Sequence, residues 1–536
     1  MMTYLKKFIY SYIVYVFLFI FHASLRTLAS LMFIPMVDNI VKSDLSNFIN
    51  IMFIIIALWI TSILFDYLSK NRKADLIKKM NNSIRTDISK RLSDMNYEDY
   101  HKREDGVYVS WYSNDINTIE KLGYESLFDI SESFVMMTVS IAALVYIHIS
   151  LAIAALLLGI IMVLFPNIFN HKIKHRSSDV SNGNEEFIKN IKDIISGYDV
   201  LKTLNLTDLF KDKIIGYSAN IEEKKYIFNK FITLIEALIF LANITCQLII
   251  TAFTGALSIY GIIPVGSILT TGNYSSSLYN SLEVISKGFI RKKSTYPIFE
   301  KISKSEHYDY NKIPIQTLAE CIDVENLNYS YGSKQVLNGV NLKFEIGKKY
   351  ALTGKSGSGK TTLVKILLGQ LEGYSGTIAY DGTELSKINT DSVLEQVAYI
   401  DQNVYLFNTT ILDNILLSRK ISDDFIKKII QKCNLTDVID SMKDGINAEV
   451  GERGSNLSGG QRQRIAIARA LAGDKKIIIV DEGTSALDKK NAEEIENLLV
   501  DDENLTLIMI SHKINEDIEK KLDKIYNLDE LPCATV

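Results

Sequence analysis

Apolar runs long enough to cross about 30 Å of hydrocarbon recur along the first half of this 536-residue chain. They predict six membrane-spanning helices, at 11–37, 48–68, 125–148, 150–171, 229–257 and 264–287. The first run is too long for a signal peptide and lacks a small-residue cleavage site, so we interpret it as a helix that stays in the protein. The pattern predicts an α-helical transmembrane domain over residues 1–300.

Positive charges sort the connections between these runs into two kinds. The connection after the first run carries only Lys42, and the turns at 147–150 and 260–264 carry no Lys or Arg, whereas 69–123 and 172–226 are rich in both. Positively charged connections stay on the cytoplasmic side of a membrane. We therefore expect a multi-pass protein with both termini and both long connections in the cytosol. A soluble protein with buried helices does not explain this asymmetry.

Each long cytosolic connection contains a short amphipathic segment near its middle. We call these segments the crosspieces, and we expect them near 97–103 and 192–200. Such crosspieces could join two cytosolic helical extensions and dock onto another domain. The alternative is an ordinary solvated helical hairpin.

Several polar and ionisable side chains fall within or next to the predicted spans, where they are costly unless they face protein or water. We interpret them as the lining of a polar, water-accessible substrate path, formed by His22, Arg26, Glu236, Asn243, Gln247, Asn273, Tyr274 and Tyr279. For each of them, hydrogen bonding between neighbouring helices is the alternative.

Short strands and helices replace the long apolar runs beyond a polar linker at 301–318. Lys349–Thr353 reads as a buried strand and 362–368 as a helix, and Gly354–Thr361 between them fits G-x-x-x-x-G-K-[ST]. Its glycines let backbone N–H groups approach phosphates, Lys360 adds a positive charge, and Thr361 offers a hydroxyl to Mg²⁺. The sequence predicts an α/β P-loop ATPase domain at 319–536.

Two further segments fit nucleotide hydrolysis. The apolar strand at 477–482 ends in two carboxylates, of which Asp481 would hold Mg²⁺ and Glu482 would orient and deprotonate the attacking water. Ser458 and the glycines after it open another helix with free N–H groups, which makes a second anion site. One active site does not need two such sites. We therefore expect the γ-phosphate to be held from both sides, with one side supplied by another subunit.

Composition narrows the range of partners. The formal net charge of −4 gives no global attraction to nucleic acid. The four cysteines show no metal-ligand or redox spacing, so we expect reduced thiols in a protein that faces the cytosol.

Residues 324–516 resemble the ATPase domain of ABC transporters, and nearly the whole chain resembles a bacterial ABC exporter half-transporter with a fused membrane domain. The motifs that carry the resemblance are, in chain order, Gly354–Thr361, Gln402, Leu457–Gln461, Asp481–Glu482, Ser485–Asp488 and His512. The loop Val450–Gly454 resembles one that favours an exporter over an importer.

The resemblance implies a role for each matching position. Catalysis would involve Glu482, His512, Gln402 and Lys360, and Mg²⁺ would contact Thr361, Gln402 and Asp481. ATP would be bound by Tyr331, Gly354, Ser356, Gly357, Ser358, Gly359, Lys360, Thr361, Thr362, Gln402, Ser458, Gly459, Gly460, Gln461, Asp481 and His512. The crosspieces would act as coupling helices.

The implied function is ATP-driven export of a peptide or an amphipathic small molecule across the bacterial plasma membrane. Multidrug efflux, lipid flipping and a membrane ATPase sensor without transport are the alternatives. A soluble relative that acts on DNA or ribosomes would lack the six spans. The working unit is expected to be a homodimer, and a heterodimer with a second half-transporter is also allowed.

Overall fold

The computed structural model describes residues 2–103, 105–164, 168–303, 312–315, 317–481, 489–511 and 514–530. The chain forms two compact units. The helical unit contains the described residues of 1–93 and 104–305, and the ATPase unit contains those of 94–103 and 306–536. The ATPase unit thus includes a short piece from the first half of the chain.

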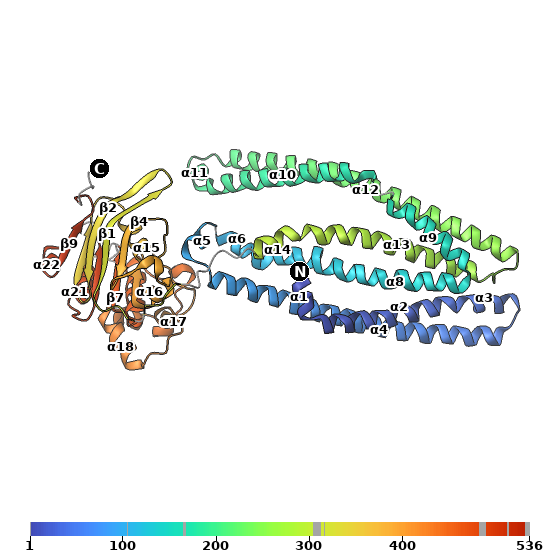
Figure 1. Ribbon diagram of the computed structural model, residues 1–536, viewed down its shortest axis with the longest axis horizontal. Coiled ribbons are helices and arrows are strands. Elements are labelled where there is room, and N and C mark those ends of the chain that lie inside the picture. The colour runs from blue at the N-terminus through green and yellow to red at the C-terminus, as the bar shows by residue number, and fades with distance from the viewer. Residues whose placement is uncertain are drawn as a thin grey trace. The chain divides into compact units, whose positions relative to one another are not determined.

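The described part of the helical unit is entirely helical apart from turns (Figure 1). Its helices are α1 (Met2–Lys7), α2 (Ile9–Leu31), α3 (Phe33–Val41), α4 (Leu45–Ser93), α6 (Asp105–Ser110), α7 (Ile116–Thr118), α8 (Glu125–Ile147), α9 (Ile149–Leu164), α10 (Asn170–Ser196), α11 (Tyr198–Thr203), α12 (Thr207–Ile259), α13 (Ser267–Ser294) and α14 (Tyr296–Ser303). Two π-helical turns, η1 (Trp111–Asp115) and η2 (Ile119–Tyr124), join α6, α7 and α8 into one long element.

Four elements of the described chain are long and apolar enough to cross a membrane, namely Ile9–Val41, Leu45–Ser93, Asp105–Ile147 and Thr207–Ile259. A shorter apolar helix covers Ile149–Ile160, and α13 is the more polar helix predicted at 264–287. The break between α2 and α3 precedes Pro35, which has no N–H to donate to the carbonyl of Leu31.

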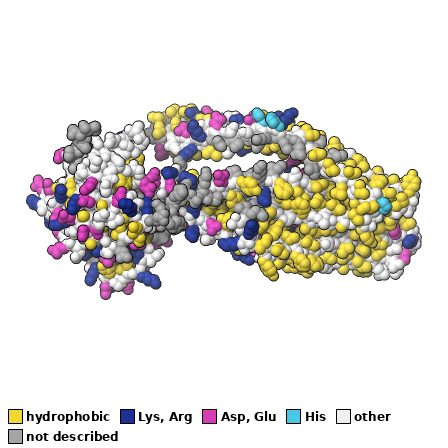
Figure 2. Space-filling view, viewed as in Figure 1, with side chains coloured by type: hydrophobic (Ala, Val, Ile, Leu, Met, Phe, Trp, Pro, Cys, Tyr) yellow, Lys and Arg dark blue, Asp and Glu magenta, His cyan; other side chains and the backbone are white. Residues whose placement is uncertain are grey.

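Buried positions follow one stripe along each long helix. On α2, Tyr15, Phe19, Ala23 and Thr27 recur every fourth residue. On α4 the buried stripe includes Ile55, Ser62, Ser69 and Leu76, one every seven residues. The small residues in these stripes let helices approach closely. Hydrophobic side chains cover the opposite, outer faces of the spans in the space-filling view (Figure 2).

One of the two predicted crosspieces forms a short helix at the expected position, and the other forms one further along the chain. The first forms α5 (Tyr97–His101), and the Asn96 side chain caps this helix by accepting a hydrogen bond from Asp99 N at 2.7 Å. The second does not form where it was expected, because α10 continues as a helix to Ser196. The short helix is instead α11, which begins after Gly197.

The ATPase unit contains two sheets. An antiparallel sheet has the order β2-β1-β4-β5, and a parallel sheet has the order β6-β7-β8-β3-β9. The strands are β1 (Cys321–Tyr331), β2 (Lys334–Glu345), β3 (Lys349–Thr353), β4 (Ser375–Tyr380), β5 (Thr383–Glu384), β6 (Val397–Ile400), β7 (Ile477–Asp481), β8 (Thr506–Ile510) and β9 (Lys524–Asn527).

Helices and helical turns connect these strands. They are α15 (Lys360–Leu367), η4 (Leu385–Lys387), α16 (Thr390–Gln396), α17 (Ile411–Leu416), α18 (Asp423–Lys432), α19 (Thr436–Asp440), η5 (Gly445–Asn447), η6 (Glu452–Gly454), α20 (Gly459–Ala472), α21 (Lys489–Val500) and α22 (Glu516–Glu519).

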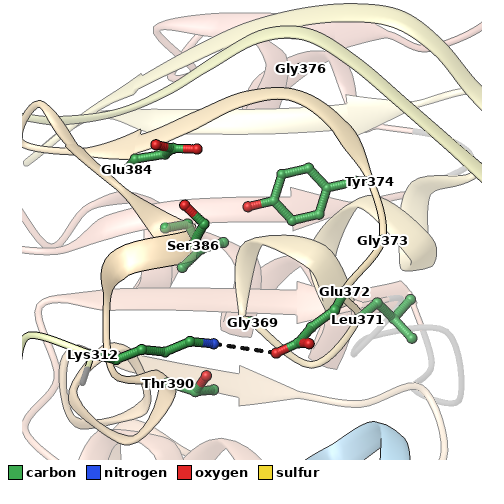
Figure 3. Close-up of a pocket in the computed structure, with 11 residues that line it drawn as sticks. Lys312, Gly369, Leu371, Glu372, Gly373, Tyr374, Gly376, Glu384, Ser386 and Thr390 are labelled. Carbon is green, nitrogen blue, oxygen red and sulfur yellow. Dashed lines mark hydrogen bonds and ion pairs between the residues drawn. The ribbon is translucent and has the colours of Figure 1, made fainter. Parts of the chain in front are cut away.

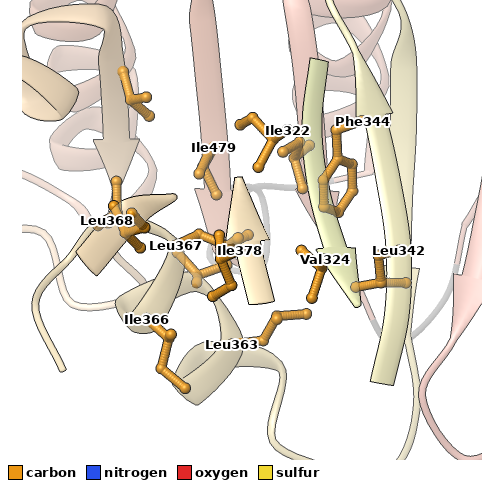
Figure 4. Close-up of a cluster of buried hydrophobic side chains, with 14 of the residues drawn as sticks. Ile322, Val324, Leu342, Phe344, Leu363, Ile366, Leu367, Leu368, Ile378 and Ile479 are labelled. Atoms are coloured by element: carbon orange, nitrogen blue, oxygen red, sulfur yellow. The ribbon is translucent and has the colours of Figure 1, made fainter. Parts of the chain in front are cut away.

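Both faces of the parallel sheet are buried, which explains the nearly continuous apolar sequence of its central strands. Along β7, Ile477 and Ile479 enter one core, and Ile478 and Val480 enter another. The first core lies between the parallel sheet, the antiparallel sheet and α15 (Figure 4). These two cores hold the carboxyl ends of β3, β6 and β7 in place, where the candidate nucleotide-binding residues begin.

Candidate functional site

The phosphate loop follows directly from the buried strand β3 and leads into α15. Its glycines Gly354, Gly357 and Gly359 have φ values of 142°, 85° and 94°. A Cβ at Gly359 would lie 2.7 Å from Leu337 Cδ2, so both the backbone conformation and the packing require glycine there. The loop leaves Ser356 and Gly357 exposed to a ligand.

Lys360 is nearly buried beneath this loop. Its Nζ donates to the carbonyl oxygens of Gly354 at 2.8 Å and of Lys355 at 2.9 Å. These neutral acceptors hold the ammonium group inside the cradle. The cradle therefore combines one positive charge with the N-terminus of α15, a combination suited to anionic phosphates. Thr362, the third residue of α15, is half-buried.

A carboxylate and two hydroxyls meet beside the loop. Thr361 Oγ1 donates to Asp481 Oδ2 at 2.8 Å, and Tyr399 Oη donates to the same oxygen at 3.2 Å. Burial and the negative charge of Asp481 raise the pKa of Tyr399, so its hydroxyl stays protonated as a donor. Oxygen ligands of this kind suit Mg²⁺, which usually takes one or two carboxylates and completes its shell with water and substrate phosphates.

The remaining predicted ATP contacts lie on separate elements. Tyr331 ends β1, is 49% exposed, and makes an edge-to-face contact with Tyr329. Gln402 follows β6, the strand that pairs with β7, and its side chain is exposed. Glu482, Ser485–Asp488 and His512 lie outside the residues that the structure describes.

The second predicted anion site is the N-terminus of α20. Ser458 Oγ accepts from Gln461 N at 3.3 Å, and Gln461 Oε1 accepts from Ser458 N at 2.8 Å, which forms a capping box. Gly459 and Gly460 are the first helical residues. Within the described chain, no hydrogen bond or ion pair joins this segment to the phosphate loop.

Sequence reasoning missed two groups at the loop, Tyr399 and Asp529. Asp529 Oδ2 accepts from Lys355 N at 2.8 Å, at the start of the cradle. The sequence did hold a signal for Tyr399, which is a polar aromatic residue three positions before Gln402. The carboxyl ends of neighbouring parallel strands meet at one edge of a sheet, so a polar side chain there can reach Asp481. We find no comparable signal for Asp529.

The first crosspiece packs against the elements that carry the nucleotide site. Lys365 Nζ, on α15, lies 5.7 Å from the ring centroid of Tyr97 on α5. Glu98 Oε2 accepts from Glu372 N at 3.4 Å, after the end of α15. A segment that interrupts the helical unit in sequence is therefore part of the ATPase unit, beside the helix that begins at the phosphate loop.

A pocket of about 300 Å³ lies on the ATPase unit away from the phosphate loop (Figure 3). Lys312 Nζ reaches across it to Glu372 Oε1 at 3.3 Å. The next residue, Ile313, pairs with Ile388 through a parallel bridge. These contacts fasten the end of the linker to the ATPase unit.

A larger cavity of about 500 Å³ lies within the helical unit, between α2, α4, α8 and α13. Of the predicted path residues, Arg26, Asn273 and Tyr274 line it. The Arg26 guanidinium lies 5.9 Å from the Trp59 ring centroid, and Tyr274 Oη donates to Thr27 O at 2.9 Å. Most other lining residues carry a hydroxyl or an amide.

Placing the charged Arg26 in a membrane helix costs free energy, and the contacts in the cavity offset only part of that cost. An arginine at the centre of a membrane helix costs about 2.5–3.5 kcal/mol on insertion scales. A cation–π contact at an exposed site offsets only about 0.5–1 kcal/mol of that cost. No carboxylate in the described chain lies within 4.0 Å of the guanidinium. Arg26 is exposed, so water or a ligand in the cavity can reach its guanidinium.

The other predicted path residues lie outside the cavity lining. His22 Nδ1 lies 3.0 Å from Ser62 O on α4, Glu236 is exposed on α12, and Tyr279 is fully buried. Asn243 donates from Nδ2 to Asn280 Oδ1 at 2.8 Å and accepts from Gln247 Nε2 at 2.8 Å. This amide chain leads to Asn280, which does line the cavity.

Comparison with known proteins matches both halves of the chain. Residues 12–282 match the family model for the ABC transporter transmembrane region, and residues 337–485 match that for ABC transporter. The chain is 27% identical over 468 residues to an ATP-dependent lipid A-core flippase of Francisella novicida, which covers 83% of this chain and 77% of that protein.

Two further similarities span most of the chain. It is 28% identical over 498 residues to a putative export ATP-binding/permease protein of Rickettsia typhi, which covers 89% of this chain and 84% of that protein. The structure of a bacterial Atm1-family ABC exporter with ATP bound superposes with a TM-score of 0.79 at 20% identity, over 99% of this chain and 95% of that one. The predicted fold class is confirmed by these matches.

Proposed function

Because this chain belongs to the ABC transporter family, as an exporter-type half-transporter with fused membrane and ATP-binding regions, we propose that two copies assemble and export a peptide or an amphipathic small molecule. Its ATPase activity is coupled to transport, as family membership establishes. The substrate, the assembly and the role of each residue are the subject of the proposal.

The observation that carries the proposal is the position of α5 inside the ATPase unit. Tyr97 and Glu98 contact α15 and the turn after it, and α15 begins at the phosphate loop. A change in how the loop holds its nucleotide therefore acts on a segment continuous with the membrane-spanning helices. Through this path, ATP binding and hydrolysis would shift α5 and with it the membrane-spanning helices.

The nucleotide site would work through a small set of groups. Lys360 and the loop N–H groups would bind the phosphates. Asp481, Thr361 and Gln402 would hold Mg²⁺, which when bound would supply positive charge to neutralise the phosphates. Glu482 accepts the proton of the attacking water, and His512 contacts the γ-phosphate. Tyr331, exposed at the end of β1, supplies a stacking face for adenine.

Two copies are needed because Ser458–Gln461 has no bond to its own phosphate loop in the described structure. In the dimer, this segment of one subunit binds the γ-phosphate held by the loop of the other. The short helix α11 and the residue after it also support a partner, since Tyr198, Val200 and Leu204 are all exposed. A homodimer is favoured because this chain carries all the motifs, and a heterodimer uses the same contacts.

We place the membrane domain at 1–300, the linker at 301–318 and the ATPase domain at 319–536. The termini and the ATPase domain face the cytosol of a bacterial cell, and the spans cross its plasma membrane. The distribution of Lys and Arg supports this orientation, because both long connections carry these residues and the short turns almost none.

Lipid flipping is the second candidate. It is favoured by the similarity to proteins named lipid A-core flippases. Multidrug efflux is the third, and a membrane ATPase sensor would hydrolyse ATP without transport. The polar lining of the cavity favours a substrate with hydrogen-bonding groups over a purely apolar one.

The test is ATP turnover by the full chain, expressed alone in lipid nanodiscs, beside Glu482→Gln. We expect turnover by the wild type and almost none by the variant, with ATP bound by both. ATP-driven uptake of substrate into proteoliposomes whose ATPase domains face outward then separates an exporter from a sensor, because a sensor would hydrolyse ATP without uptake. Binding of ATP by both proteins without turnover by either would rule out the homodimer. Equal turnover by both would remove Glu482 from its assigned role.

A further inference from the structure

We propose that the cavity between α2, α4, α8 and α13 is a binding site for the anionic group of an amphipathic molecule, a carboxylate or a phosphate, which pairs with Arg26 and accepts a hydrogen bond from Asn280, two residues of the cavity lining. This inference rests on the proposed export function, because it names the chemical class of the substrate.

The residues that line the cavity carry positive charge and no negative charge. Arg26 is the single ionisable cation among the residues that line the cavity, and no Asp or Glu is among them. The residue lies close to the middle of the 33-residue apolar element Ile9–Val41. A cation inside a membrane-spanning helix normally has a partner of opposite charge. None is supplied by the described chain, so the ligand is the natural partner.

Trp59 lies beside the cation. The centroid of its ring is 5.9 Å from the guanidinium carbon of Arg26, and no hydrogen bond within the described residues engages the guanidinium N–H groups. A guanidinium presents parallel donors that match a carboxylate or a phosphate. The aromatic face beside it gives the apolar part of an amphipathic molecule a surface to pack against.

A chain of amide hydrogen bonds ends at Asn280 in the cavity lining. Gln247 Nε2 donates to Asn243 Oδ1, and Asn243 Nδ2 donates to Asn280 Oδ1, each at 2.8 Å. The bond from Asn243 fixes the orientation of the Asn280 amide, whose N–H₂ group donates to Ser276 Oγ at 3.5 Å, another residue of the lining. The chain therefore holds the N–H₂ donors of Asn280 along the lining, where an anionic oxygen can accept from them.

The size of the cavity suits such a group. A volume of about 500 Å³ falls in the range of about 300–1,000 Å³ for small-molecule sites. This is enough for a terminal carboxylate with adjoining residues of a peptide, or for a lipid phosphate. The two sources share their chemistry and are separated by the test.

The test uses Trp59 as its own reporter, since the chain has only two tryptophans and the other, Trp111, is fully buried. The full chain in phosphatidylcholine nanodiscs is titrated with N-dodecanoyl-leucine, with its uncharged amide, and with dodecyl phosphate. Fluorescence gives the half-saturating concentration of each, and Trp59→Phe shows which signal comes from the cavity.

We expect the acid to bind about tenfold or more tightly than the amide, because a hydrogen bond to a charged group replaces one to a neutral group. This ratio should fall towards one in Arg26→Gln and stay at the wild-type value in Arg72→Gln. Arg72 is the matched control, because it lies on α4 beside Asp75 and outside the cavity. In Asn243→Leu, which frees Asn280 to turn, the ratio should fall about threefold.

An acid-to-amide ratio near one, no response to either probe, or a ratio unchanged in Arg26→Gln overturns the inference. A tighter response to dodecyl phosphate assigns the group to a lipid, and a tighter response to the acid assigns it to a peptide. The binding assay needs no ATP. If the acid and the amide bind equally well while Glu482-dependent ATP turnover is intact, only this site is rejected. If turnover is absent, the proposed homodimeric exporter is rejected.

Discussion

Replacing Tyr399 by Phe tests how Asp481, the proposed magnesium ligand, is held in place. The substitution removes one hydroxyl and keeps the ring in its place on β6. In the wild type, Asp481 Oδ2 accepts from Tyr399 at 3.2 Å and from Thr361 at 2.8 Å. If Thr361 turned its hydroxyl to Mg²⁺, as proposed, Tyr399 would remain as the donor that fixes the carboxylate. We therefore expect Tyr399→Phe to weaken Mg²⁺ use and leave ATP binding itself intact.

The magnitude follows from the geometry. A hydrogen bond to a charged group contributes about 1.5–3 kcal/mol. The length of 3.2 Å is at the long end, so about 1.5 kcal/mol is the appropriate value, which corresponds to about a tenfold rise in half-saturating Mg²⁺. Because burial and Asp481 raise the pKa of Tyr399, the effect should be the same from pH 6 to pH 9.

The assay is ATP turnover in nanodiscs against free Mg²⁺ at saturating ATP. The matched control is Tyr526→Phe, which removes another hydroxyl of the ATPase unit, one that donates to Lys343 O at 2.7 Å on β2. It should lower thermal stability without changing the Mg²⁺ requirement. An unchanged half-saturating Mg²⁺ in Tyr399→Phe, or an equal rise in both variants, would refute the reasoning.

Three further substitutions or treatments follow from described contacts. Tyr97→Ala removes the contact with Lys365, and ligand-stimulated turnover should fall severalfold while basal turnover persists; parallel losses of both would contradict coupling through α5. Asn414→Ala breaks several buried hydrogen bonds, including those with the backbone of Phe407 at 2.9 Å, and should cost about 2–4 kcal/mol, seen as a lower inactivation temperature. Burial raises the pKa of Cys433 to about 12, so mass spectrometry should find it unlabelled by iodoacetamide at pH 8 in the native protein and labelled in urea; native labelling would show that this core opens.

The features that the sequence predicted well are local in the chain. Gly354–Thr361 could be identified because its glycines, lysine and threonine lie within eight residues and their conformation depends on near neighbours. The buried strand Lys349–Thr353 has the predicted bounds, since a strand covered on both faces needs an unbroken apolar run. The turn at 147–150 also formed as expected, between α8 and α9.

The boundaries of the long cytosolic helices were less predictable. The second crosspiece was expected near 192–200, whereas α10 ends at Ser196 and α11 covers Tyr198–Thr203. An amphipathic pattern shows that a segment is helical and half-buried. It does not show where one helix stops and another begins, because both have the same period.

Contacts between distant parts of the chain were decided by the tertiary structure. Tyr399 and Asp481 are 82 positions apart, and the amide chain joins Asn243 on α12 to Asn280 on α13. The sequence by itself determined which segments form long apolar helices and where the glycine-rich loop between β3 and α15 lies, because burial and backbone conformation leave a periodic or local pattern. Only the packing decided that α5 belongs to the ATPase unit and that Arg26 contacts Trp59 in the lining of a cavity, because a side chain's partner depends on helices and strands brought together from elsewhere in the chain.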